Sequence, residues 1–256
     1  MRHRHSLLRS AFVASVVAVV SAAGASVTYA SVHPPRTGWS LPTSSTTTTI
    51  HHAPPPQGVT VVVSTPTPIS GYAKPNGKVI AKVPTTWLGS ALVMPVISSV
   101  PGWDWVRLPG RPNGSTAWIK TSGLIVSSTP YKIIVNLTTK HLQVLKFNKV
   151  VMSAPVGIGT VQNPTPTGNF FIAAFAASPN SSYGPVVTVT TAHSNTITDW
   201  AGSGDAVVAI HGPIGADAAI GKTGARVSHG CIRMHVSDQL HFLGFVRLGV
   251  PITITY

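Results

Sequence analysis

Short apolar runs, each broken by a turn, fill the chain from residue 58 onward. In the first half of this region they alternate with polar residues at the period of a half-buried strand, as in 103–108, and Pro, Gly and Asn mark the turns between them. Arg111-Pro112-Asn113-Gly114 is predicted to be a hairpin turn. The pattern predicts strands over 59–63, 79–83, 91–96, 103–108 and 116–119.

The second half repeats the same kind of pattern and contains one candidate helix. A short helix is predicted over 238–246 with Ser237 as its N-cap. Val, Ile, Thr and Gly are frequent while strong helix formers are few, so the protein is expected to be mainly β. Strands are predicted over 131–137, 141–147, 150–156, 170–174, 186–190, 206–211 and 251–256.

The first 57 residues do not continue this pattern. Residues 1–30 have a basic start, an apolar run and small residues before Ala25 and Ala30, which is the layout of a secretory signal peptide or, if uncleaved, of a membrane anchor. Residues 31–57 are rich in Pro, Ser and Thr and predict a disordered linker. We therefore expect an exported protein at the cell wall or extracellular face, with membrane contact only through that N-terminal segment.

The charge of the chain favours an anionic partner. Lys and Arg number 18 against five acids, all aspartates, so the formal net charge is +13. Such a surplus suits anionic polymers of a cell wall. Nucleic acid is not expected as a partner, because the sequence has no basic helix and no aromatic-basic RNA motif.

The chemistry of the chain centres on its single cysteine. Cys231 lies in Ser228-His229-Gly230-Cys231-Ile232-Arg233, and the pair His211-Gly212 precedes it by twenty positions, 231 − 211. A histidine base can generate the thiolate that a nucleophilic cysteine needs. Either His211 or His229 could serve; we prefer His211 because an apolar strand, 206–210, leads into it. The alternatives are a buried, inert cysteine and a zinc site of His211, His229 and Cys231, which lacks an evident fourth ligand.

Three segments carry a resemblance to a known family. Asn163-Pro164-Thr165-Pro166-Thr167-Gly168-Asn169-Phe170, His211-Gly212 and the segment 228–234 are similar to the L,D-transpeptidase (YkuD) catalytic domain, and 248–254 resembles its last strand. The resemblance covers about 131–256. Residues 58–128 resemble the small SH3-like β modules that bind cell walls. The implied fold is a β-sandwich or barrel catalytic domain with one short helix at 129–256, after a small β-barrel-like module.

The resemblance also implies a role for each matching residue. Cys231 would be the nucleophile and His211 its base, oriented by the carbonyl of Gly212. The backbone amides of His229, Gly230 and Cys231 would face the oxyanion, Ser228 would fix the loop, and Arg233 would bind a substrate carboxylate. No cofactor is implied.

The expected function is that of a peptidoglycan L,D-transpeptidase, which forms 3→3 cross-links between stem peptides through a cysteine thioester. An L,D-carboxypeptidase that trims stem peptides and a non-catalytic wall-binding protein are the alternatives.

Two further residues have ambiguous patterns. His193 fits either a cleft wall or a solvated loop, and Tyr183 fits either a substrate contact or a structural turn. Since 58–128 holds no nucleophile and base, a fragment from about residue 128 is expected to keep the chemistry.

Overall fold

A computed structural model describes residues 55–222 and 225–256. The predicted signal segment and nearly all of the linker lie outside these residues. We refer to 58–128 as the N-terminal module and to 129–256 as the C-terminal domain. Within the described residues, no helix is long and apolar enough to cross a membrane.

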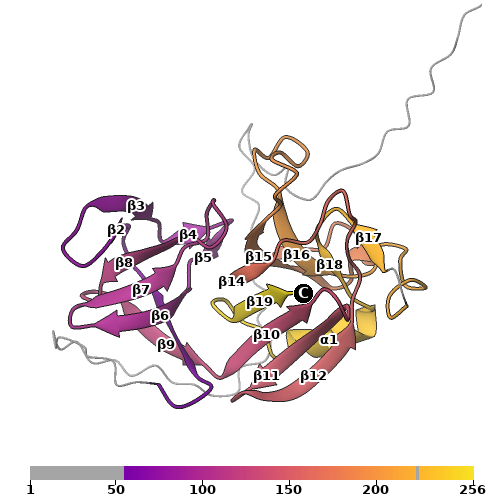
Figure 1. Ribbon diagram of the computed structural model, residues 1–256, viewed down its shortest axis with the longest axis horizontal. Coiled ribbons are helices and arrows are strands. Elements are labelled where there is room, and N and C mark those ends of the chain that lie inside the picture. Colours follow the sequence, from indigo (N-terminus) through magenta and orange to yellow (C-terminus); the bar gives the residue numbers. More distant parts are fainter. Residues whose placement is uncertain (1–54, 223–224) are drawn as a thin grey trace, which may run out of the picture.

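The N-terminal module is one antiparallel sheet with a small hairpin beside it (Figure 1). Its strand order is β3-β2-β8-β7-β6-β1-β9, and β4 pairs with β5. The strands are β1 (Thr60–Ser64), β2 (Ile69–Tyr72), β3 (Val79–Val83), β4 (Thr86–Trp87), β5 (Ser90–Ala91), β6 (Met94–Val100), β7 (Trp103–Arg107), β8 (Thr116–Lys120) and β9 (Ile125–Thr129).

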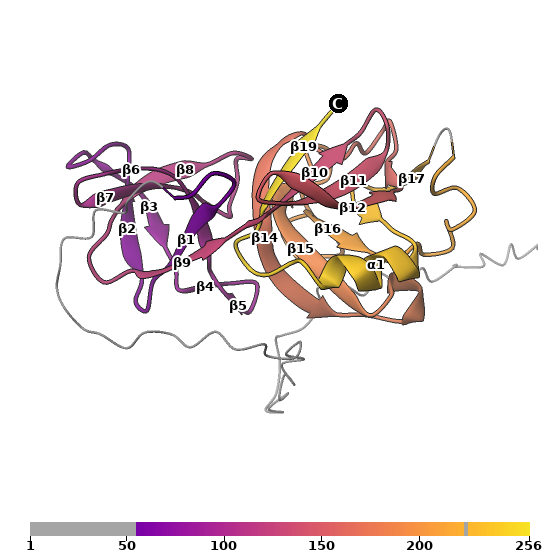
Figure 2. The same ribbon diagram turned by 90° about the horizontal axis from the view of Figure 1, so that it is seen from below.

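The C-terminal domain is built on a second, eight-stranded sheet, with a pair of short strands and one α-helix against it (Figure 2). The order in the sheet is β12-β11-β10-β19-β14-β15-β16-β18, and β13 pairs with β17. Its elements are β10 (Tyr131–Asn136), β11 (His141–Lys146), β12 (Lys149–Pro155), β13 (Ile158–Gly159), β14 (Gly168–Ala177), the 3-10 helix η1 (Ser181–Tyr183), β15 (Val186–His193), β16 (Val207–His211), β17 (Arg226–Ser228), β18 (Ile232–Arg233), α1 (Val236–Leu243) and β19 (Pro251–Thr255).

The middle of strand β14, residues 170–174, is buried on both faces, and this joins the two parts of the chain. Phe170 and Ile172 point into the core of the C-terminal domain, whereas Phe171 and Ala173 pack with Val63, Leu92, Met94, Val106 and Ile119 of the N-terminal module. A strand covered on both faces has a continuous apolar sequence, as in Phe170-Phe171-Ile172-Ala173. Removing the module would therefore uncover the Phe171 side chain, which is fully buried.

The expected fold class is confirmed, since the protein is mainly β with a single α-helix among the described residues. The predicted helix boundaries were wrong: α1 spans Val236–Leu243 and follows His235, whose side chain makes no capping bond. His235 instead places its Nδ1 2.7 Å from Asp217, and its carbonyl accepts the Gln239 amide. Sequence periodicity also missed β2, β4, β9, β13, β17 and β18.

Candidate active site

Parallel pairing of β16 with β18 brings the His211 and Cys231 segments together. The register sets Ile210 opposite Ile232 and His211 opposite Arg233. Cys231 directly precedes β18, and the backbone of Ala209 on β16 forms a hydrogen bond with it. Residue 157 pairs with Arg233 on the other side through two backbone hydrogen bonds of 2.8 Å. The strand after Cys231 is thus fixed on both edges.

The His211 ring is buried and held in one orientation. Its Nδ1 lies 2.7 Å from the carbonyl oxygen of Gly212, and a carbonyl can only accept, so Nδ1 carries the proton. Nε2 of the neutral ring is then left with a lone pair. The ring of Tyr183 packs against that of His211, with centroids 4.9 Å apart.

Gly212 has to be a glycine for this arrangement to form. Its amide donates to the Tyr183 carbonyl at 2.7 Å, and a β-carbon on Gly212 would lie 2.6 Å from backbone atoms of both Tyr183 and Gly184. Buried Gln239 of α1 donates to the Val186 carbonyl just beyond this turn. The helix therefore supports the turn that carries Tyr183.

Burial shifts the pKa values of the candidate nucleophile and the candidate base in opposite directions. The pKa of His211 falls to about 4, mainly because the ring is buried. The hydrogen bond to Gly212 opposes this fall, and the charge of nearby Arg233 adds to it. Burial raises the pKa of the Cys231 thiol, although the Ala209 hydrogen bond and Arg233 oppose that rise. These two shifts, a lowered pKa for the imidazole and a raised pKa for the thiol, both favour the neutral form of the group near pH 7.

The loop before Cys231 is held by side-chain hydroxyls. Ser228 Oγ donates to the Cys231 carbonyl at 2.5 Å and accepts the Gly230 amide at 3.1 Å. Thr165, which is buried, donates to the Gly230 carbonyl at 2.8 Å and accepts the Gly159 amide at 2.9 Å. The Gly230 amide that we expected to face an oxyanion is thus engaged within the loop, and the amides of His229 and Cys231 are left as candidates for that role.

Arg233 lies between the candidate catalytic groups and the turn after β16. Its Nη1 makes long contacts with the carbonyls of Pro213 and Ile214, at 3.4 and 3.5 Å. Burial lowers its pKa, and its charge interacts with Cys231 and Tyr183. The guanidinium can therefore stabilise a thiolate at Cys231 or bind a carboxylate brought in by a substrate.

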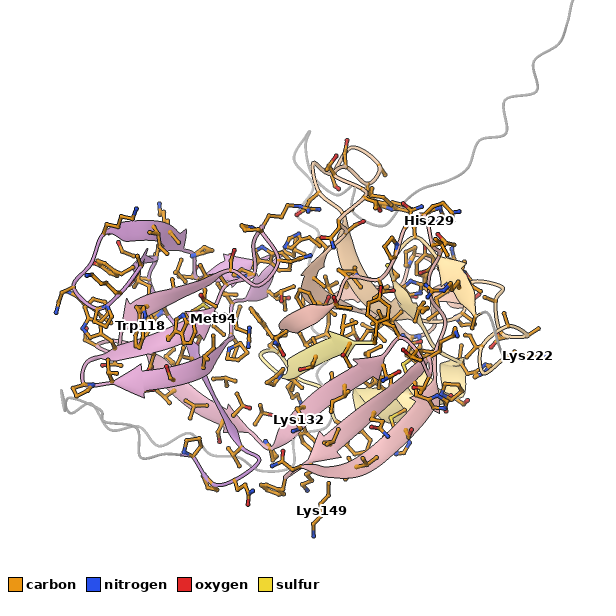
Figure 3. All side chains as sticks on the ribbon, viewed as in Figure 1. Met94, Trp118, Lys132, Lys149, Lys222 and His229 are labelled. Atoms are coloured by element: carbon orange, nitrogen blue, oxygen red, sulfur yellow. The ribbon has the colours of Figure 1, made fainter. Side chains whose placement is uncertain are left out.

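His229 occupies a different environment from His211. It is exposed at the surface of the C-terminal domain (Figure 3) and packs against the half-buried ring of Trp200, with centroids 5.4 Å apart. Trp200 belongs to the loop 194–206 between β15 and β16. No group of three His, Cys, Asp or Glu side chains in the described residues is arranged to hold a metal ion, so His211, His229 and Cys231 do not form one.

Both interpretations of His193 were wrong. It is 1% exposed and lies at the contact with the N-terminal module, where Nε2 is 2.7 Å from the Pro109 carbonyl and Nδ1 is 2.7 Å from Asp205. Sequence reasoning also missed Thr165 and Trp200. Thr165 lay within the quoted Pro-Thr-Pro-Thr-Gly segment, while nothing local in the sequence pointed to Trp200.

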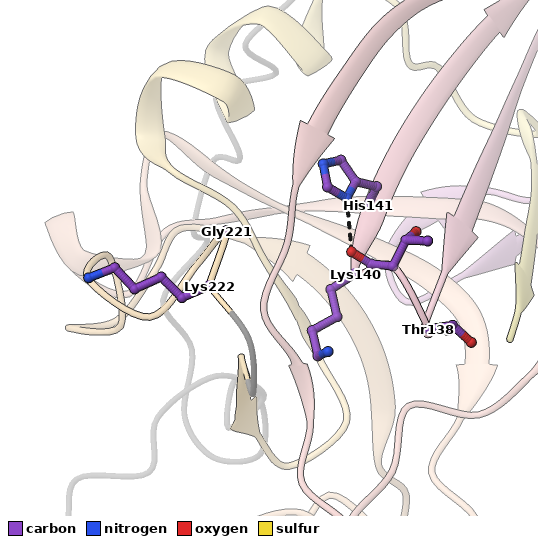
Figure 4. A pocket seen from close by; sticks show the side chains of 6 residues that line it. Thr138, Lys140, His141, Gly221 and Lys222 are labelled. Atoms are coloured by element: carbon purple, nitrogen blue, oxygen red, sulfur yellow. Dashed lines mark hydrogen bonds between the residues drawn. The ribbon is translucent and has the colours of Figure 1, made fainter.

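A separate pocket of about 320 Å³ is lined by residues from two turns, Thr138, Thr139, Lys140, His141, Gly221 and Lys222. None of them belongs to the cluster around Cys231. His141 Nδ1 donates to the Thr139 carbonyl, 2.9 Å away, and the amines of Lys140 and Lys222 point in different directions (Figure 4). These cations do not converge on one ligand position.

Comparison with known proteins identifies relatives of the C-terminal domain. Residues 130–254 match the family YkuD, described as the L,D-transpeptidase catalytic domain. A Bacillus subtilis protein provisionally named L,D-transpeptidase YkuD is 31% identical over 125 residues, which are 49% of this chain and 66% of that protein. Its Bacillus licheniformis counterpart is 29% identical over 126 residues, with the same coverage. The solved catalytic domain of the E. faecium L,D-transpeptidase is 24% identical, with 48% of this chain and 95% of that chain covered and a TM-score of 0.34.

Proposed function

Because residues 130–254 are an L,D-transpeptidase catalytic domain of the YkuD type, we propose that this chain is a peptidoglycan L,D-transpeptidase that forms 3→3 cross-links through a thioester at Cys231. The observation that carries the proposal is the parallel pairing of β16 with β18. It sets a buried, singly oriented imidazole on the strand beside the only thiol of the chain.

The first half of the reaction acylates the enzyme. His211 Nε2 takes the proton of the Cys231 thiol as the sulfur attacks the carbonyl carbon of the third residue of a donor stem. Amides of His229 and Cys231 face the oxyanion, where one donor contributes roughly 3 kcal/mol of barrier lowering. The intermediate then breaks the peptide bond, His211 returns the proton to the leaving amine, and terminal D-Ala departs.

The second half transfers the acyl group. The side-chain amine of a neighbouring stem attacks the thioester, His211 accepts a proton from that amine, and the Cys231 thiolate leaves and receives that proton from His211. The scissile bond supplies the acyl group, so no nucleotide and no cofactor are needed. Arg233, whose guanidinium lies in this cluster, stabilises the thiolate and can bind a stem carboxylate.

Mass spectrometry of the products tests this proposal. Wild-type protein and a purified tetrapeptide stem should give a dimer that has lost one D-Ala, and Cys231→Ala should give none while remaining folded. A tripeptide without dimer would favour the L,D-carboxypeptidase. Wild-type protein that leaves the stem unchanged yet binds insoluble wall would favour the non-catalytic alternative.

We also propose that the N-terminal module, as an SH3-like domain, binds the wall. Tyr72, Trp118 and Trp105 stand opposite one another across β2, β8 and β7 and are half-buried (Figure 3 labels Trp118). The module has six Lys and Arg residues, and its one acid, Asp104, is buried. Aromatic rings bind sugar faces and the cations suit anionic polymers.

Binding to insoluble peptidoglycan at low and high salt tests the role of the module. Trp105→Ala with Trp118→Ala should weaken retention at both salt concentrations, because stacking on sugars is not screened by salt. Lys120→Ala should weaken it at low salt only. Unchanged retention of all variants would argue against this role.

A further inference from the structure

The loop 194–206 that carries Trp200 is hydrogen-bonded to a turn of the N-terminal module. The turn joins β7 to β8, and the loop joins β15 to β16; β15 lies on the side of the C-terminal domain that faces the module (Figure 1). About 80 residues separate the contacting groups in the sequence. This contact is distinct from the apolar packing around Phe171.

The side chain of Asn113 forms hydrogen bonds with the backbone at the start of the loop, as the backbone of a neighbouring strand would. Its Oδ1 accepts the His193 amide at 2.8 Å, and its Nδ2 donates to the His193 carbonyl at 2.7 Å and to Asn195 Oδ1 at 3.1 Å. One side chain thereby satisfies both backbone groups of His193, the last residue of β15.

Arg111 holds the end of the loop. Its Nε and Nη2 each lie 2.8 Å from Asp205 Oδ1, and Nη2 also donates to the Ile197 carbonyl at 3.3 Å. Asp205 in turn accepts the Ala206 amide at the base of the loop and contacts His193. Burial opposes ionisation of Asp205, but the Ala206 amide, Arg111 and His193 together lower its pKa.

The far side of the loop faces the catalytic cluster. The Trp200 ring packs on His229, two residues before Cys231, and Thr196 donates to Asn163 Oδ1 at 3.0 Å, close to Thr165 in the chain. The loop is closed by backbone bonds from Trp200 to the Asp205 carbonyl and from Ser194 to the Ala206 carbonyl. A displacement at Arg111 or Asn113 would therefore move Trp200 relative to His229.

We propose that Arg111 and Asn113 are positioning residues for the transfer reaction, because they hold the loop so that Trp200 and His229 form a fixed wall for the donor stem beside Cys231. The inference rests on the proposed function. It gives the N-terminal module a part in substrate binding in addition to its proposed affinity for the wall.

The test compares Arg111→Ala and Asn113→Asp with Arg107→Ala in the full chain. Asn113→Asp keeps the shape but replaces the donor amide by an acceptor, and Arg111 is on the surface, so both variants should fold. Arg107 is a matched control because it also reaches the C-terminal domain from the module, at the Asn169 carbonyl 3.5 Å away, without touching the loop. Three quantities are measured: KM and kcat for a stem tetrapeptide, hydrogen exchange of residues 194–206, and alkylation of Cys231 by iodoacetamide.

Both loop variants should raise KM about fivefold, which corresponds to about 1 kcal/mol at 25 °C, with little change in kcat. Exchange should speed up within 194–206, and the alkylation rate of Cys231 should stay at the wild-type value. Arg107→Ala should match wild type in all three measurements. In a Trp200→Ala background, Arg111→Ala should cause no further rise in KM, because the two residues act through one contact.

An equal rise in KM with and without Trp200 would overturn the inference, as would faster exchange with an unchanged KM or no change in either quantity. A slower alkylation in the loop variants would show that they disturb Cys231 itself and would also overturn it. Wild-type protein that transfers no stem peptide would defeat the proposed function instead, and the inference with it.

Discussion

Replacing Thr165 by Val should show how much the hydrogen bonds of its hydroxyl, as distinct from the packing of its side chain, contribute to holding the Cys231 loop. Valine has nearly the same shape as threonine, but it removes the hydroxyl that joins the Gly159 amide to the Gly230 carbonyl. Thr165 is 2% exposed, so water cannot replace these bonds without rearrangement. Leaving one buried polar group unpaired costs about 1–3 kcal/mol, and two therefore cost about 2–6 kcal/mol.

Two other variants make this prediction specific. Thr165→Ser keeps both hydrogen bonds and loses one methyl group, which should cost only about 1 kcal/mol. Thr190 is also fully buried and makes an equivalent pair of bonds, to the Val208 carbonyl at 2.7 Å and from the Ala192 amide at 3.1 Å. Thr190→Val should therefore lose a similar free energy of unfolding without releasing the Cys231 loop.

The assays are urea unfolding followed by tryptophan fluorescence, and stem-peptide transfer under conditions where each variant is folded. Thr165→Val should lower kcat by about 100-fold, the size of effect expected when catalytic groups shift by about 1 Å, whereas Thr165→Ser and Thr190→Val should lower it far less. The reasoning is refuted if Thr165→Val is as stable as Thr165→Ser, or if both Val variants lose transfer activity equally.

Three more predictions follow from burial. His211 has a folded pKa of about 4 against an ordinary 6.5, so the unfolded chain binds more protons than the folded chain between these pH values. The free energy of unfolding should therefore fall by up to about 3 kcal/mol as the pH drops through this window. Urea midpoints of wild type and His211→Gln check this, and equal pH dependence of the two proteins would contradict it. The alkylation rate of Cys231 should keep rising with pH beyond neutrality because its thiol pKa is raised, and a rate that is flat between about pH 5 and 8 would instead indicate a thiolate–imidazolium pair. If His229→Ala rather than His211→Ala changed this profile, the proposed base would be wrong. A fragment of residues 129–256 should bind a hydrophobic dye and unfold at lower urea than the full chain, because Phe171 becomes exposed; equal stability would contradict the shared core.

The sequence was most informative where a feature depends on neighbours along the chain. Alternating residues located most of the longer strands, and the segments around His211 and Cys231 were readable because their residue types and spacing are unusual. The short strands β13, β17 and β18 have two or three residues each, too few to show a period, although β18 sets the register of the candidate site.

The features that sequence reasoning missed depend on contacts between distant residues. His193 stands in a Thr-rich stretch that looks solvated, yet it is 1% exposed, with the Pro109 carbonyl, 84 residues away in the sequence, 2.7 Å from its Nε2 and Asp205 Oδ2 2.7 Å from its Nδ1. The start of α1 was misplaced since Ser237 has the residue type of a good cap, whereas His235 precedes the helix and pairs with Asp217. The dual burial of β14 required knowing that a second module covers Phe171.

The place of β19 in its sheet has a consequence for how the C-terminal domain forms. β19 comes last of the described strands but lies between β10 and β14, with Ile252 paired to both Ile133 and Phe170. The hairpin of β10 and β11 can form early from local contacts, whereas closing the centre of the sheet requires a loop of more than a hundred residues. A fold dominated by such distant pairings has a high contact order and folds slowly. Until residues 251–255 insert, β10 and β14 each present an open edge to solvent, and this interval is when the chain is most exposed to pairing with another copy of itself.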